Sequence, residues 1–204
     1  MWSFEDGVHR FQHDVFRQRE RLFRALADEG QHPHAAFIAC ADSRVVMTMI
    51  TDTGPGEIFL IRNAGNAILP YHRGRANGEA ASLEYAVEVL GVRDIVVCGH
   101  TGCGAIRAVM ATEPTGLEQL EAWMEAFQPT ATRVAERHPE ADGEARLRAA
   151  VGENVLVQLE HVRTFPFIRH HLEEHDLELH GWVYELDTGT VLRHDAATGT
   201  FVTL

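Results

Sequence analysis

Two groups of chemically reactive residues each follow a short, continuous apolar run, and this arrangement constrains the fold more than any other feature. The run at 35–39 leads into C-A-D-S-R at 40–44, and the run at 94–98 leads into G-H-T-G-C at 99–103. Short apolar runs of this kind are typical of buried parallel strands. Because ligands collect beyond the carboxyl ends of such strands, we expect the two distant groups to meet at one edge of a sheet.

The segments around these runs predict alternating strands and helices. Another apolar run at 58–61 is followed by a helical stripe at 78–90, and Gly91 is placed to end that helix. Further helices are expected at 117–137, 144–161 and 165–174, and a strand at 177–186 pairs with one at 191–194. The chain therefore predicts an α/β fold with a mostly parallel central sheet of four to five strands, flanked on both faces by helices.

The first thirty residues predict a long amphipathic helical arm that Gly30 ends. Apolar residues recur there at steps of three and four, which places them on one helix face. They are Phe4, Val8, Phe11, Val15, Leu22 and Leu26. Such a face needs a surface to cover, either the chain's own core or a partner subunit. No linker of Pro, Gly or Ser divides the chain, so 1–204 is interpreted as a single domain with an arm at 1–30.

Charge and cysteine content exclude several classes of partner. The formal net charge of −12 repels nucleic acid phosphates and anionic lipid. No run of 18 apolar residues and no signal sequence is visible, so we expect a cytoplasmic protein without a membrane partner. Three cysteines in such a chain favour metal or redox chemistry over a disulfide framework.

Cys40, His100 and Cys103 are the candidate ligands of a Zn²⁺ ion. Taken alone, Cys40 is as easily a small core residue, and a two-residue Cys/His spacing recurs in many folds. Together they supply two thiolates and an imidazole, a donor set that zinc prefers. Three protein ligands leave a fourth position for water, as catalytic zinc sites do. We interpret Cys98, on the same apolar run as His100, as a buried inert thiol.

Asp42 and Arg44 lie two residues apart beside the first candidate ligand. In an extended turn both side chains can point the same way and form a bidentate ion pair. An ordinary structural ion pair is one interpretation. The functional one is a catalytic dyad that acts as a switch. Arg44 would hold Asp42 away from the metal, and a released Asp42 would become the fourth ligand of a closed site.

At these residues the chain resembles the β-class carbonic anhydrases, in particular the branch with plant and cyanobacterial members. The resemblance covers nearly the whole chain and is carried by six motifs in that family's order, together with Q-H-P at 31–33. The motifs are C-A-D-S-R at 40–44, P-G-E-I-F at 55–59, R-N-A-G-N at 62–66, E-Y-A-V at 84–87, H-x-x-C-G at 100–104 and H-G-W-V-Y at 180–184.

The resemblance implies zinc held by the three candidate ligands and a catalytic role for the Asp–Arg pair. It also implies a CO₂ pocket and arms that wrap a partner subunit in a homodimer or a higher even-numbered oligomer. The implied pocket residues are Gln31, acting across a dimer interface, Phe59, Ala64 and Tyr85, with the backbone N–H of Gly104 as a further donor. From the residues alone, Phe59 and Tyr85 could equally be core aromatics, and Gln31 a solvated amide.

The expected function is reversible hydration of CO₂ to bicarbonate and a proton, by attack of a zinc-activated hydroxide. Two alternatives use the same site. One is a hydrolase of CS₂ or COS, and the other is a non-catalytic scaffold that binds zinc or bicarbonate. Carboxysomal relatives carry a long C-terminal tail, whereas this sequence stops at Leu204, so we do not expect carboxysome targeting.

Overall fold

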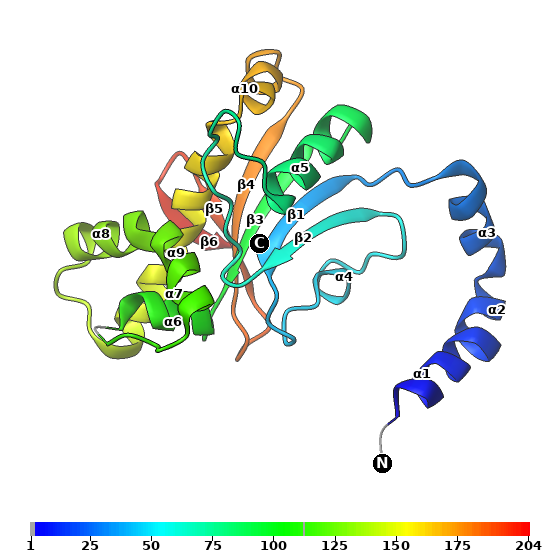
Figure 1. Ribbon diagram of the computed structural model, residues 1–204, viewed down its shortest axis with the longest axis horizontal. Coiled ribbons are helices and arrows are strands. Elements are labelled where there is room, and N and C mark those ends of the chain that lie inside the picture. Colours follow the sequence, from blue (N-terminus) through cyan, green and yellow to red (C-terminus); the bar gives the residue numbers. More distant parts are fainter. Residues whose placement is uncertain (1–2, 112) are drawn as a thin grey trace.

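A six-stranded sheet forms the centre of the computed structural model, which describes residues 3–111 and 113–204 (Figure 1). Its strands run in the order β2-β1-β3-β4-β5-β6, with the first four parallel and the last two antiparallel. Their bounds are β1 (Ala35–Cys40), β2 (Ile58–Asn63), β3 (Asp94–His100), β4 (Glu178–Tyr184), β5 (Val191–Asp195) and β6 (Thr200–Thr203). The predicted α/β class with a mostly parallel sheet is confirmed.

The described residues contain one strand more than the upper limit of the prediction. β6 is short and lies at the sheet edge, where Val202 is exposed. An edge strand of four residues leaves no alternation long enough to read from sequence. The predicted strands at 35–39, 58–61 and 94–98 are present and extend by one or two residues toward the reactive groups.

Helices cover the two faces of the sheet unequally. One face carries the main core, built with side chains of α5, α6, α8, α9 and α10. The other face has a smaller core, to which α4 contributes Met47 and Ile50. The bounds are α4 (Met47–Ile50), α5 (Gly78–Glu84), a π-helical turn η2 (Tyr85–Val89), α6 (Gly104–Met110), α7 (Glu118–Met124), a 3₁₀ turn η3 (Glu125–Phe127), α8 (Gln128–Arg137), α9 (Gly143–Arg163) and α10 (Pro166–Glu173). Helices therefore lie on both faces, as predicted, but the second face is covered by the four-residue helix α4.

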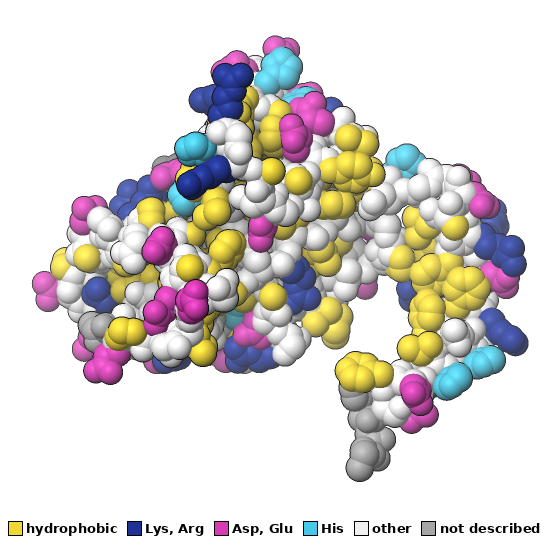
Figure 2. All heavy atoms as spheres, in the orientation of Figure 1, with side chains coloured by type: hydrophobic (Ala, Val, Ile, Leu, Met, Phe, Trp, Pro, Cys, Tyr) yellow, Lys and Arg dark blue, Asp and Glu magenta, His cyan; other side chains and the backbone are white. Residues whose placement is uncertain are grey.

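The N-terminal arm is helical, as predicted, but it is divided. It consists of α1 (Phe4–Arg10), a π-helical turn η1 (Phe11–Val15), α2 (Phe16–Gln18) and α3 (Glu20–Glu29). Arg19 leaves helical geometry with a ψ of 19°, and Gly30 ends α3 with a positive φ of 86°. The arm extends away from the rest of the chain, and Figure 2 shows hydrophobic side chains on the surface of the arm that faces the rest of the chain. Residues 1 and 2 of the predicted arm lie outside the described part.

Close packing of α9 against β3 and β4 positions the carboxyl edge of the sheet. Gly99 and Gly181 make this approach possible, because an added Cβ at Gly99 would lie 2.9 Å from Val155 Cγ2 and one at Gly181 would lie 3.0 Å from Val155 Cγ1. Gly99 directly precedes His100, so the helix fixes the end of β3 that carries this side chain. Among the described residues, no helix has the length and apolar character needed to cross a membrane.

Candidate metal centre

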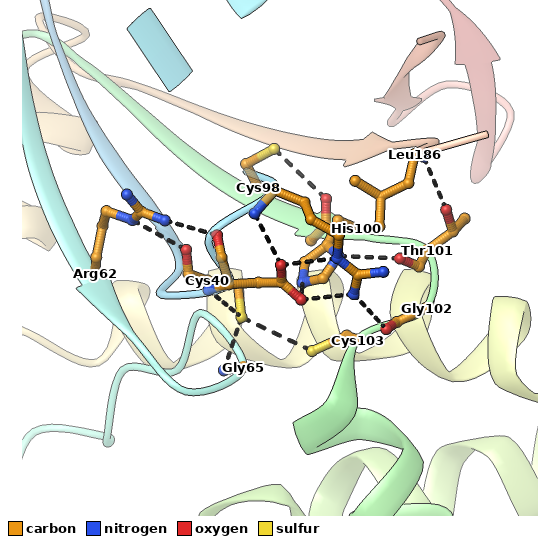
Figure 3. A network of polar contacts seen from close by, with 12 residues as sticks. Cys40, Arg62, Gly65, Cys98, His100, Thr101, Gly102, Cys103 and Leu186 are labelled. Carbon is orange, nitrogen blue, oxygen red and sulfur yellow. Dashed lines mark hydrogen bonds and ion pairs between the residues drawn. The ribbon is translucent and has the colours of Figure 1, made fainter. Parts of the chain in front are cut away.

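Cys40, His100 and Cys103 meet at the carboxyl edge of the sheet (Figure 3). Cys40 is the last residue of β1, His100 is the last residue of β3, and Cys103 is the N-cap of α6. One sulfur or nitrogen atom from each lies within 4.8 Å of the other two. All three side chains are buried. The expected meeting of two distant segments therefore occurs in the structure.

The imidazole of His100 is oriented by a backbone acceptor. Its Nδ1 lies 2.9 Å from the Thr101 carbonyl oxygen, which makes Nδ1–H the donor and leaves the Nε2 lone pair free. Nε2 is buried and has no hydrogen-bond partner within the described part of the chain. A buried nitrogen without a partner is costly, and a metal ion is the kind of partner that such an orientation serves.

The separation of the two sulfurs fits a tetrahedral ion. Two sulfurs bound at zinc's usual distance in a tetrahedral site lie roughly 3.8 Å apart, and Cys40 Sγ lies 3.9 Å from Cys103 Sγ. Either thiol can donate a hydrogen bond to the other across this contact. The hydrogen bond from Cys103 lowers the pKa of the Cys40 thiol to about 4, whereas the same contact and burial raise the pKa of Cys103. The residues present therefore fit a zinc ion by donor type, spacing and burial.

Cys40 also accepts hydrogen bonds from two backbone amides. The amides of Asp42 and Gly65 each lie 3.4 Å from its sulfur. Donors aimed at a thiolate favour its charged form, so both amides favour the ligating state of Cys40. Cys98 differs, because its sulfur points away from the cluster and burial raises the pKa of its thiol to about 12. This matches its interpretation as an inert thiol.

Asp42 and Arg44 form the bidentate pair that the sequence suggested. Arg44 Nε donates to Asp42 Oδ1 at 2.9 Å and its terminal nitrogen donates to Oδ2 at 2.7 Å. Arg44 also donates to the Gly102 carbonyl oxygen at 3.2 Å. The hydrogen bonds from Arg44 to the carboxylate hold the pKa of Asp42 well below its usual range. Oδ2 lies 3.9 Å from His100 Nε2, so the paired carboxylate sits at the border of the cluster.

Arg62 is a residue of the site that received no role from sequence reasoning. Its Nε donates to the Cys40 carbonyl oxygen at 3.0 Å, and a terminal nitrogen donates to the Asp42 carbonyl oxygen at 2.9 Å. The guanidinium thus fixes the turn that carries both a ligand and the carboxylate. A charge directly after the apolar run at 58–61 was a visible signal, but Arg62 is exposed and its partners are backbone carbonyls, which no sequence pattern names.

The structure divides the predicted substrate pocket into two groups. Ala64 and Gly104 lie beside the metal cluster. Ala64 precedes the Gly65 amide that donates to Cys40, and Gly104 begins α6 directly after Cys103.

The other three residues lie far from the cluster. Phe59 pairs in register with Ala36, which comes four residues before Cys40 on β1. Four strand residues place Phe59 about 13 Å from the metal edge. Tyr85 lies with Phe59, their ring centroids 6.2 Å apart, and Gln31 precedes β1 at the same end. One protomer therefore does not bring these three beside its own cluster.

The fold and the site define an α/β protein built around a buried cysteine–histidine cluster that fits a metal ion. The family model described as carbonic anhydrase matches residues 35–191. A carbonic anhydrase of Pseudomonas aeruginosa is 46% identical over 98% of this chain and 90% of its own length. One of Synechocystis is 39% identical over 97% of this chain and 72% of its own length.

Solved structures agree with these relatives. The β-carbonic anhydrase CcaA superposes with a TM-score of 0.93 at 37% identity, over 98% of both chains. A tetrameric β-carbonic anhydrase of Sordaria macrospora gives a TM-score of 0.83 at 27% identity, over 97% of this chain and 95% of that one. The chain belongs to the β class of the carbonic anhydrase family, and it is therefore an enzyme of the lyase class.

Proposed function

We propose that this carbonic anhydrase interconverts CO₂ and bicarbonate at a Zn²⁺ ion held by Cys40, His100 and Cys103. The observation that carries the proposal is the buried cluster of two sulfurs and one imidazole nitrogen, which has no hydrogen-bond partner among the residues that the structure describes. When bound, zinc supplies a Lewis acid that makes hydroxide available near neutral pH, for which the three-histidine carbonic anhydrase is the standard example. The remaining chemistry belongs to the residues around it.

Asp42 orients the nucleophile in this proposal. Because Arg44 keeps its pKa low, the carboxylate is ionised at neutral pH and can only accept hydrogen bonds. It would therefore accept a hydrogen bond from the oxygen that attacks CO₂ and so direct a lone pair of that oxygen at the substrate. Arg44 restrains Asp42 through two side-chain hydrogen bonds. If the pair parted, Asp42 would become a further ligand of the metal and close the site, which is the switch that the spacing of the two residues suggested.

The substrate pocket combines residues of two subunits. Ala64 supplies an apolar contact, and the Gly104 amide lies in the first turn of α6, where backbone N–H groups lack intrahelical partners. A Cβ added at Gly104 would meet no protein atom within 4 Å, so space for a small substrate lies beside it. Gln31, Phe59 and Tyr85 of a second copy would complete the pocket, which requires a homodimer or a higher even-numbered oligomer. The expected cytoplasmic location stays a prediction.

Zinc content and CO₂ hydration, measured together, test the proposal. We expect one zinc per chain and stopped-flow hydration that rises across pH 6.5–9, a window around the pH near 7 at which zinc-bound water often ionises. Asp42→Asn keeps the zinc and lowers kcat by about 100-fold or more, the usual cost of losing a positioned proton acceptor. Zinc without turnover at any pH would instead favour a binding scaffold, and turnover of CS₂ or COS alone would favour the hydrolase alternative.

A further inference from the structure

Three buried polar side chains lie between α8, α9 and the loop at 64–68. Thr130 and Gln158 have no exposed surface, and Asn154 is only 1% exposed. Polar groups at this depth are stabilising only when they are hydrogen-bonded. Neither the proposed chemistry nor the packing of an apolar core accounts for them, so their partners are informative.

Their hydrogen bonds converge on the loop. Asn154 Nδ2 donates to the Gly65 carbonyl oxygen at 3.1 Å, and Gln158 Oε1 accepts from the Ile68 amide at 2.9 Å. Gln158 Nε2 and Thr130 Oγ1 both donate to Asn154 Oδ1, at 3.0 and 3.2 Å. The two ends of the Asn154 amide are thereby assigned, and its donor end is fixed toward Gly65.

Trp123, outside this group, holds the neighbouring peptide. Its Nε1 donates to the Ala64 carbonyl oxygen at 2.8 Å. That carbonyl belongs to the same peptide plane as the Gly65 N–H, which lies 3.4 Å from Cys40 Sγ. Trp123 therefore orients the plane that donates to the sulfur, while Asn154 holds the plane that follows it.

Packing removes the remaining freedom of this turn. Gly65 has a φ of 83°, and a Cβ there would lie 2.7 Å from Phe127 Cζ and 3.0 Å from the Ala105 side chain. The turn thus accepts no side chain and is pressed against the aromatic ring. The Ala64 and Gly65 carbonyls are both hydrogen-bonded, and the Gly65 α-carbon packs against Phe127. The peptide therefore cannot turn, and the Gly65 N–H stays directed at Cys40.

We propose that Trp123 and Asn154 are positioning residues of the metal centre, which aim the Gly65 amide at the Cys40 sulfur and so set its strength as a metal ligand. The inference rests on the proposed zinc site. An amide that donates to sulfur stabilises the thiolate and lowers the energy of its lone pairs. Groups that orient metal ligands in this way commonly change metal affinity by 10- to 100-fold when they are lost.

Full-length protein with Trp123→Phe and Asn154→Asp tests the assignment. Phenylalanine keeps an aromatic ring beside Phe127, whose centroid lies 6.5 Å from that of Trp123, and removes the N–H donor together with part of the indole. Aspartate keeps the acceptor for Thr130 and Gln158 but offers an oxygen to the Gly65 carbonyl. In chelator competition with Zn²⁺ alone we expect each dissociation constant to rise by about tenfold. In the Co²⁺-substituted protein the sulfur-to-cobalt charge-transfer band should move to longer wavelength.

Thr130→Val is the matched control, because it removes one buried hydrogen bond of the network, while Gln158 Nε2 still donates to Asn154 Oδ1 and keeps the donor end of Asn154 toward Gly65. It should lower thermal stability and leave the zinc dissociation constant and the cobalt band unchanged. If Asn154→Asp does not fold, Trp123→Phe decides, since Trp123 is only partly buried. Variants that match the wild type in affinity and spectrum would overturn the positioning role alone. A wild-type protein that binds no zinc would overturn this role and the proposed function together.

Discussion

Asp42 and Arg44 show how a single pair of side chains sets the charge at the border of the metal centre. The two hydrogen bonds from the Arg44 side chain place both carboxylate oxygens, and they keep the pKa of Asp42 low. Since a depressed pKa means that Asp42 stays ionised through the neutral range, a change of pH around 7 does not protonate it. The Arg44 guanidinium is the group that holds the carboxylate in its present position.

Arg44→Lys tests this dependence, because an ammonium group cannot reproduce a planar fork on a carboxylate. We expect kcat to fall about tenfold or more with zinc content retained, as for other groups that orient a metal site. Stopped-flow hydration and metal analysis measure the two quantities. Arg107→Lys is the control, because Arg107 makes a single exposed ion pair with Glu144, and its kcat should stay within about twofold of wild type. An unchanged kcat in Arg44→Lys would contradict the restraining role.

The candidate ligands could be predicted because their chemistry resides in side chains that follow recognisable strands. The groups that orient them could not. The Gly65 amide carries no signal of its own, and Trp123 reaches the Ala64 carbonyl of the same peptide from 59 positions away in the chain. Arg62 was visible as a charge in a strand, but its acceptors are backbone carbonyls, which every residue has. Such contacts depend on tertiary approach, which local patterns do not encode.

At the scale of elements, α9 fixes the position of the metal edge by lying close to β3. The contact depends on the missing side chain of Gly99, next to His100, and on Val151 and Val155 of the helix. Cores packed to this density accept added atoms only by moving. A methyl group at Gly99 would therefore separate the helix from the strand that ends in a candidate ligand.

Gly99→Ala should destabilise the protein by about 1–3 kcal/mol, the usual cost of overpacking. Urea unfolding of the metal-free protein measures the change. Gly78→Ala is the matched control, since Gly78 begins α5 and a Cβ there would meet nothing within 4 Å. Alanine at that helical position should leave stability unchanged or raise it slightly. Equal urea midpoints for Gly99→Ala and Gly78→Ala would show that α9 moves to accept the methyl group at no cost in stability. The close contact between α9 and β3 would then not constrain the fold.

Periodicity identified the long helices and the parallel strands, and it failed where elements are short or interrupted. The four-residue α4 and the edge strand β6 offer too few positions for a pattern. The break at Arg19 falls between Val15 and Leu22, a step of seven that an unbroken helix would also show, so the apolar stripe does not mark it. The interruption in the helix predicted at 117–137 is a 3₁₀ turn at Glu125–Phe127, which packs Phe127 into the core.

At the scale of the whole molecule, two features support the proposed assembly of more than one copy. The arm exposes Val8, Phe11 and Val15 by 42–54%, which is unusual for a contiguous apolar stripe in a monomer. Three predicted pocket residues also lie at the opposite end of the strands from the metal cluster. A second copy that covers the arm and inserts its own Gln31, Phe59 and Tyr85 would resolve both features.

Val8→Asp and Val15→Asp separate assembly from folding. Neither side chain belongs to the buried core, so a charge there should change the stability of one chain by no more than about 0.5 kcal/mol. The same charge buried against a partner would lack a counterion and would oppose association. Light scattering after size exclusion should give an even-numbered oligomer for the wild type and a monomer for the variants. Gln12→Asp adds equal charge outside the apolar stripe and should remain assembled.

If the pocket spans two subunits, the monomers keep their zinc but lose hydration activity. Monomeric variants with full activity would confine the pocket to one chain, and a monomeric active wild type would remove the proposed role of the arm.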